Sequence, residues 1–167
     1  SLQGDSVLQE IYSQLGVETN FQGHCLVLSK KKNAVLTKNI SLDLSSAPDI
    51  AQTIAVSCFE LGISCDLTGL HTLKIKETDR LEALNTELSK LGAEISVTND
   101  SLHLQSASTI VENIAIDTYN DHRMAMAFAP LALKTSISIN DAEVVSKSYP
   151  DFWSDLQAMH FTVLKIS

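Results

Sequence analysis

Residues 79–92 read DRLEALNTELSKLG. The leucines of this stretch recur every three or four residues, which is the spacing of one apolar face of an α-helix. Asp79 and Glu82 at its start resemble a helix-capping pair, and Gly92 after its last leucine is typical of a helix end. The stretch therefore predicts a helix over residues 79–91, and the rest of the chain repeats its design.

A helix of the same design is predicted near the start of the chain. Residues 5–15 have the same apolar spacing and are followed by Gly16, 76 positions before Gly92. After each glycine come two short stretches of strand-like residues with a turn between them, which predicts a β-hairpin. The predicted strands are 17–21 with 25–28 in the first hairpin, and 93–98 with 102–105 in the second.

A second pair of helices follows the same order. Residues 48–61 are apolar nearly all round and should form a buried helix that ends at Gly62. Residues 121–133 should form its counterpart, kinked or shortened by Pro130. A strand is predicted after each helix, and a third helix and a last strand follow. These elements are the strands 63–67 and 136–139, the helix 150–159 and the strand 161–166.

The repeated order of elements predicts a mixed α/β (α+β) fold made of βαβαββ-type units. The chain of 167 residues has the length of one domain. The repeat units are expected at about 1–75 and 76–147, with a partial third unit at 148–167.

Composition excludes several classes of protein. The formal net charge of −8 argues against binding to nucleic acid through broad phosphate neutralisation, although a small anion can still bind in a local basic pocket. No apolar run reaches the roughly 20 residues of a membrane span, and no secretory signal is recognised. Three cysteines without a paired spacing favour the reducing cytoplasm, and the scattered histidines show no metal-binding pattern.

Two aspartate–lysine pairs occupy equivalent positions of the repeat. Asp49 and Asp121 each stand at the start of the second helix of a unit, and Lys76 and Lys147 each stand before the next helix. If the repeats pack face to face, these residues and the helix N-termini beside them form a site for an anionic small molecule. The alternative for each aspartate alone is an ordinary helix-start residue.

Two polar clusters accompany these pairs. Glu77 lies between Lys76 and Arg80 and is a candidate general acid or base in a cationic setting; the alternative is a solvated helix start. Arg123 lies one residue from a predicted buried face, where a guanidinium needs an anionic partner. The neighbouring His122 is interpreted first as a packing histidine and second as a base.

The clusters resemble a known enzyme family. The motif Lys-Glu-Thr-Asp-Arg-Leu at 76–81 and the motif Tyr-Asn-Asp-His-Arg-Met-Ala-Met at 119–126 closely resemble 5-enolpyruvylshikimate-3-phosphate synthases, and the likeness extends along essentially the whole chain. It covers only the C-terminal lobe of that family. The resemblance implies transfer of the enolpyruvyl group of phosphoenolpyruvate to the 5-hydroxyl of shikimate 3-phosphate, in the shikimate pathway, with no cofactor and no metal.

The resemblance also implies a role for each matching residue. Asp49 would contact the shikimate hydroxyls and help to deprotonate the attacking one, and Glu77 would move the proton at the phosphoenolpyruvate methylene carbon. The implied substrate contacts are Lys76 on shikimate 3-phosphate, Arg80 and Arg123 on the phosphoenolpyruvate carboxylate, Lys147 on its phosphate, and Asp121 beside Arg123. Thr72 stands where the family often has an asparagine on the shikimate phosphate.

The family's N-terminal lobe has no counterpart in this sequence. We therefore expect a partial active site that is inactive alone, with glyphosate as a candidate inhibitor of the assembled enzyme. Two other hypotheses remain at this point: a non-catalytic anion-binding domain with the same fold, and a repeat scaffold whose polar clusters only cap helices.

Overall fold

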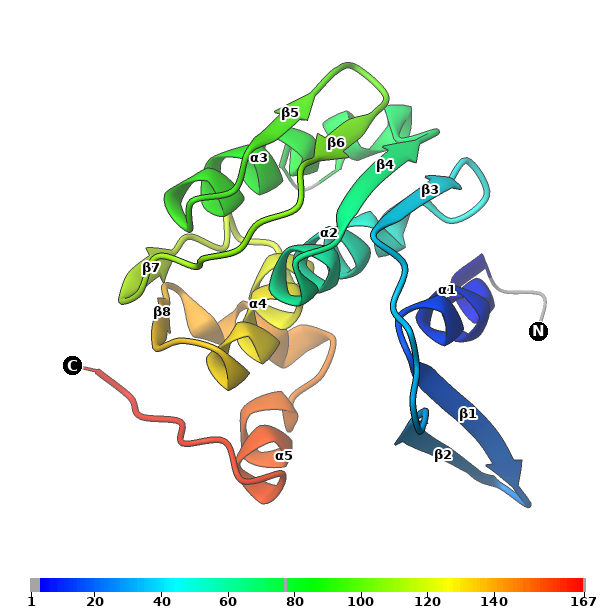
Figure 1. Cartoon of the computed structure of the whole chain (residues 1–167). Coiled ribbons are helices and arrows are strands. Elements are labelled where there is room, and N and C mark those ends of the chain that lie inside the picture. Colours follow the sequence, from blue (N-terminus) through cyan, green and yellow to red (C-terminus); the bar gives the residue numbers. More distant parts are fainter. Residues whose placement is uncertain (1–3, 77, 167) are drawn as a thin grey trace.

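The computed structural model describes residues 4–76 and 78–166, and their fold is mixed α/β as the sequence predicts (Figure 1). The α-helices are α1 (Leu8–Gln14), α2 (Ala51–Leu61), α3 (Arg80–Lys90), α4 (His122–Phe128) and α5 (Phe152–Ala158). Short 3-10 helices are η1 (Gly4–Val7), η2 (Pro48–Ile50), η3 (His71–Ile75), η4 (Ala129–Leu133) and η5 (Ala142–Lys147). The strands are β1 (Val17–Gln22), β2 (Cys25–Lys30), β3 (Asn39–Asp43), β4 (Ser64–Thr68), β5 (Ile95–Val97), β6 (Leu102–Leu104), β7 (Ile114–Ile116) and β8 (Ile137–Ile139).

The strands form three separate sheets. The largest has the order β3-β4-β6-β5, in which β3 and β4 run parallel and the hairpin β5–β6 adds antiparallel to β4. The hairpin β1–β2 is a two-stranded antiparallel sheet, and β7–β8 is a two-stranded parallel sheet. Both predicted hairpins are confirmed, whereas β3 and β7 were not predicted.

Helix α2 lies at the centre of the core and packs against α4 and β4. Its residues Ile54, Ala55 and Phe59 are at most 1% exposed, as expected for a helix that is apolar on nearly every side. Because α2 and α4 are in contact, the two helix starts that carry Asp49 and Asp121 come close together. The predicted repeat thereby places its equivalent aspartates in one region.

The ends of the helices follow the predicted signals. The Asp79 side chain accepts a hydrogen bond from the backbone N–H of Glu82 at 3.1 Å, which fixes the start of α3. Gly62 ends α2 in the left-handed region at φ 69°, where a side chain is disfavoured. Pro130 lies in η4, so α4 ends at Phe128 and the chain continues as a 3-10 helix.

The prediction of a strand over residues 161–166 is wrong. These residues are extended but belong to none of the sheets in the described part of the chain. The side chain of Gln157 donates to the carbonyl of Val163, and Phe161 and Val163 pack beside α5 instead of joining a ladder. The segment is therefore extended but has no partner strand among residues 4–76 and 78–166. No helix among the described residues combines the length and the apolarity that crossing a membrane requires.

Candidate active site

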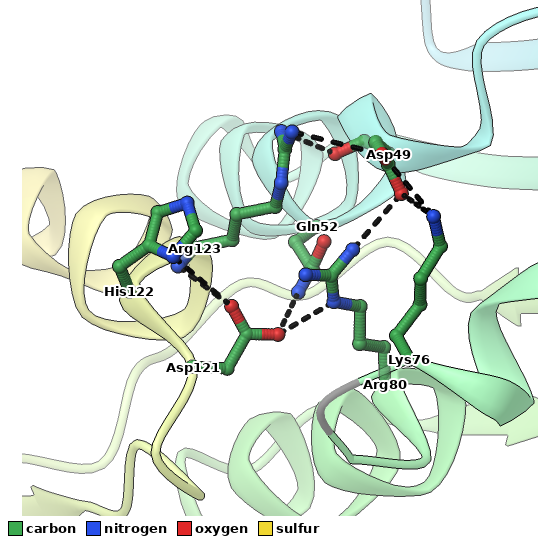
Figure 2. A network of polar contacts seen from close by, with 7 residues as sticks. All are labelled: Asp49, Gln52, Lys76, Arg80, Asp121, His122 and Arg123. Atoms are coloured by element: carbon green, nitrogen blue, oxygen red, sulfur yellow. Dashed lines mark hydrogen bonds and ion pairs between the residues drawn. The ribbon is translucent and has the colours of Figure 1, made fainter. Parts of the chain in front are cut away.

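Four loops and helix starts meet at one group of polar side chains (Figure 2). Asp49 comes from η2 just before α2, Lys76 from the end of η3, Arg80 from the first turn of α3, and Asp121 and Arg123 from the start of α4. Because η2 leads into α2 and Arg80 opens α3, the positive ends of both helix dipoles lie at this group. Five of the eight predicted site residues are thus brought together.

Asp49 is the centre of the group. Its carboxylate lies 3.2 Å from Lys76 Nζ, 2.9 Å from Arg80 Nη1 and 3.6 Å from Arg123 Nη2. The side chains of Asp49, Lys76 and Arg123 are 30–33% exposed, so this part of the group faces solvent. Arg80 also pairs with the buried Asp121, so the three cations face two carboxylates and leave one positive charge that an anionic ligand can use.

A buried ion pair stabilises Asp49 on the side that faces the core. Arg80 is 2% exposed and Asp121 is fully buried, and Arg80 Nε lies 2.5 Å from Asp121 Oδ2. A buried charge is tolerated when it is paired and hydrogen-bonded, and here one guanidinium holds both aspartates. The two aspartates that the repeat singled out are therefore joined through Arg80.

Arg123 has two attachments to the group. Its backbone N–H donates to Asp121 Oδ1 at 2.9 Å, which makes Asp121 the N-cap of α4, and its guanidinium donates to the carbonyl of Asp49 at 3.1 Å. The expected anionic partner of Arg123 is thus Asp49. The neighbouring His122 has its Nδ1 3.9 Å from Asp121 Oδ1, at the edge of the group.

Gln52 was missed by the sequence reasoning. Its side chain is fully buried on α2, and its Nε2 donates to Asp121 Oδ2 at 3.5 Å. Its Oε1 is buried without a hydrogen-bond partner among the described residues. The available signal was one amide in a helix that is otherwise apolar on its inner side, because a buried amide needs polar partners.

Three predicted residues lie outside this network. Glu77 is not among the described residues. Lys147 ends η5, which packs on α4, but its exposed side chain forms no ion pair within the described part of the chain. Thr72 lies in η3, and its hydroxyl is buried without a hydrogen-bond partner in the described structure.

A second buried carboxylate holds the loop that leads to Asp121. Glu87 is fully buried on α3, pairs with Lys90 at 2.8 Å and accepts a hydrogen bond from the Tyr119 hydroxyl at 2.6 Å. Tyr119 and Asn120 both have positive φ, 54° and 56°, which is an unfavourable conformation for residues with side chains. Burial and the bond to Glu87 raise the pKa of Tyr119 to about 12. The loop is therefore fixed by α3 directly before Asp121.

A surface groove in the described part of the chain lies elsewhere. It has a volume of about 740 Å³ and is lined mainly by residues of α1 and β1, with Ser13 and Lys31 among them. None of the residues of the Asp49 group lines it. The chemistry of this chain is therefore assigned to the polar group and not to the groove.

Comparison with known proteins agrees with the motifs. The family described as EPSP synthase (3-phosphoshikimate 1-carboxyvinyltransferase) matches residues 1–156. A 3-phosphoshikimate 1-carboxyvinyltransferase of Bacteroides fragilis strain YCH46 is 43% identical over 166 residues, which are 98% of this chain and 40% of that protein. One of Clostridium acetobutylicum is 37% identical and matches 95% of this chain and 36% of its own length.

A solved structure shows the same fold. EPSP synthase from Acinetobacter baumannii superposes with a TM-score of 0.72 at 24% identity, over 89% of this chain and 37% of that chain. The chain thus spans about two fifths of the length of its curated relatives. The resemblance seen in the two motifs is confirmed, and this chain belongs to the EPSP synthase (3-phosphoshikimate 1-carboxyvinyltransferase) family.

Proposed function

We propose that this chain supplies one part of the active site of a synthase that transfers the enolpyruvyl group of phosphoenolpyruvate to shikimate 3-phosphate. The observation that carries the proposal is the group in which Lys76, Arg80 and Arg123 surround Asp49. Each substrate bears a carboxylate and a phosphate, and guanidinium groups suit both anions. Membership of the family is the basis for the proposed reaction, and the geometry of the group identifies side chains that fit it.

The proposed chemistry begins at Asp49. As the 5-hydroxyl oxygen of shikimate 3-phosphate attacks the central carbon of phosphoenolpyruvate, Asp49 would accept the hydroxyl proton, and Glu77 would deliver a proton to the methylene carbon. The tetrahedral intermediate would then lose a proton from that carbon to Glu77, and Asp49 would pass its proton to the phosphate as the carbon–oxygen bond to phosphate breaks. The Asp49 side chain is 30% exposed, so its carboxylate can contact a ligand.

The remaining residues would bind and orient the substrates. Arg123 would release Asp49 and take the phosphoenolpyruvate carboxylate. Arg80 was predicted on the same carboxylate, but it is 2% exposed and pairs with both aspartates, so here it would hold the site together from the buried side with Asp121. Lys147, which is exposed and forms no ion pair with the described residues, would contact the phosphate of phosphoenolpyruvate. The Thr72 hydroxyl would donate a hydrogen bond to the shikimate phosphate. Glyphosate, another small anion, would bind the same cations.

The proposal is tested in a chimaera. This chain would replace the matching 40% of the Bacteroides fragilis relative, and phosphate release would be measured with both substrates present. Glu77→Gln should lower kcat by about 10²–10⁴-fold with little change in KM, because the proton transfer is lost while the binding charges remain. Arg123→Lys should mainly raise the KM for phosphoenolpyruvate, because a two-pronged contact becomes a single one.

A matched control separates these effects from general damage. Glu94→Gln makes the same chemical change at an exposed position after α3 and should leave kcat and KM unchanged. If Glu77→Gln behaves like Glu94→Gln, Glu77 is not the proton carrier. If the chimaera binds phosphoenolpyruvate but releases no phosphate, the anion-binding hypothesis replaces the catalytic one.

A further inference from the structure

The loop that leads into α4 contains a turn with an unusual backbone conformation. In residues 118–121, the N–H of Asp121 donates to the carbonyl of Thr118 at 2.8 Å. The two central residues, Tyr119 and Asn120, both have positive φ, which is the pattern of a type I′ turn. Such turns favour asparagine, aspartate and glycine, so Tyr119 occupies a position that its side chain disfavours. Contacts outside the turn therefore have to hold it.

The buried carboxylate of Glu87 makes these contacts. The Tyr119 hydroxyl donates to Glu87 Oε1 at 2.6 Å, and the backbone N–H of Asp117 donates to Glu87 Oε2 at 3.2 Å. Lys90 Nζ lies 2.9 Å and 2.8 Å from the same two oxygens and supplies the opposite charge that a buried carboxylate needs. One side chain of α3 thus binds the loop at two positions directly before Asp121.

The same face of α3 also binds the residue that follows the turn. Arg80 lies seven residues before Glu87, a spacing of about two helical turns that places both side chains on one side of α3. Arg80 is 2% exposed, and its Nε lies 2.5 Å from Asp121 Oδ2. Glu87 fixes the backbone of the turn and Arg80 fixes the carboxylate after it, so α3 determines where Asp121 lies.

Asp121 in turn determines the position of Arg123. Asp121 Oδ1 accepts the backbone N–H of Arg123 at 2.9 Å and caps α4, and the Arg123 side chain extends from there toward Asp49 (Figure 2). A shift of the turn would move the cap and the first residues of α4 with it. A guanidinium that binds a carboxylate through two hydrogen bonds tolerates little displacement, so the position of Arg123 depends on the turn.

We propose that Glu87 is a positioning residue for phosphoenolpyruvate, which acts through the Tyr119 hydroxyl and Asp121 on Arg123. The inference rests on the proposed function, in which Arg123 binds the phosphoenolpyruvate carboxylate, and neither Glu87 nor Tyr119 contacts a substrate in this role. Without the hydroxyl bond, the turn leaves its unfavourable conformation in most molecules, and only the remaining fraction binds phosphoenolpyruvate well. The apparent affinity falls by that fraction, whereas saturating phosphoenolpyruvate restores the arrangement.

Steady-state kinetics of the Bacteroides fragilis chimaera test this role. Tyr119→Phe removes only the hydroxyl and should raise the KM for phosphoenolpyruvate about tenfold, with kcat and the KM for shikimate 3-phosphate at saturating phosphoenolpyruvate nearly unchanged. The matched control Tyr12→Phe removes a hydroxyl that bonds Ser57 Oγ at 2.7 Å between α1 and α2, and it should leave all three constants unchanged. Loss of folded enzyme would lower kcat and leave both KM values unchanged. The same phosphoenolpyruvate KM in both variants overturns the proposal.

Two double variants test the path from Glu87 to the turn. Glu87→Met keeps the length of the side chain without an acceptor, and adding Tyr119→Phe to it should raise the phosphoenolpyruvate KM no further, because both changes break the same bond. Adding Asn120→Gly to Tyr119→Phe should bring that KM back toward the parent value, because glycine adopts positive φ without a steric cost. Effects of Glu87→Met and Tyr119→Phe that multiply, or no recovery with Asn120→Gly, would contradict the proposed path.

A measurement without turnover separates this inference from the proposed function. Backbone hydrogen exchange over residues 119–126 of the same chimaera, followed by mass spectrometry, should be faster in Tyr119→Phe than in Tyr12→Phe. The reason is that the capped N–H of Arg123 is protected in fewer molecules once the turn is released. A chimaera without turnover contradicts the proposed function alone, and the exchange rates still test the effect of Tyr119 on α4. Equal exchange in the two variants overturns the positioning role.

Discussion

Removing the carboxylate of Asp121 should destabilise the fold more than most single substitutions. Asp121 is fully buried, pairs with Arg80 at 2.5 Å and caps α4 through the N–H of Arg123. Breaking a buried ion pair on one side costs about 3–5 kcal/mol, and loss of a cap costs about 1 kcal/mol. Arg80 keeps Asp49 at 2.9 Å, which offsets part of the loss. We expect Asp121→Ala to lower the free energy of unfolding by about 3–4 kcal/mol, against a usual total of about 5–15 kcal/mol.

Urea unfolding at pH 7, followed by circular dichroism, measures this loss. Asp151→Ala is the matched control, because Asp151 also precedes a helix but is exposed and makes no side-chain cap. It should change the free energy of unfolding by less than about 0.5 kcal/mol. Asp121→Asn keeps the volume and a cap acceptor but loses the charge, so it should fall between the two. A loss for Asp121→Ala no larger than that for Asp151→Ala would refute the view that this ion pair holds the site.

Three further outcomes are expected. In urea titrations, Leu104→Ala should lower the free energy of unfolding by about 2–4 kcal/mol and Leu28→Ala by less than about 0.5 kcal/mol, because only Leu104 is buried. Equal losses would contradict this difference in burial. In the folded chain, a thiol reagent should modify only exposed Cys25 rapidly and reach the other two cysteines after unfolding, and burial of those two is disproved if all three react together. The pKa of Tyr119 is raised to about 12, so the contribution of this residue to stability should be complete below pH 10 and be lost as the pH rises through 12. Ultraviolet titration of the chain and of Tyr119→Phe measures this pKa. A Tyr119→Phe variant with the same phenolate titration curve as the parent chain would contradict the raised pKa.

Much of the fold could be predicted because its signals are local. The spacing of apolar residues predicted α1 and α3, a stretch that is apolar nearly all round predicted α2, and a glycine follows each of the three. The turn between two strand-like stretches predicted each hairpin. Strands β3 and β7 were missed because each pairs in parallel with a strand that follows the next helix, β4 or β8, so no local turn signal marks them. The segment 161–166 shows the reverse error, because strand-like residues do not form a strand without a partner.

The candidate site was predictable to the extent that the repeat places equivalent residues together. Asp49 and Asp121 were selected by their equivalent positions, and α2 and α4 bring them to one place. The sequence could not show that Arg80 joins them, because that contact depends on how α3 packs against α2. Glu87 was outside the prediction for the same reason, since its partner Tyr119 lies 32 residues away.

The central claim is that this chain holds one part of an active site and needs the rest of the enzyme for turnover. Phosphate release from phosphoenolpyruvate in the presence of shikimate 3-phosphate tests it most directly, with the chain alone and with the Bacteroides fragilis chimaera measured side by side. The account predicts no release above background from the chain alone and release from the chimaera that depends on Asp49 and Glu77. Turnover by the chain alone at the rate of the chimaera would contradict it.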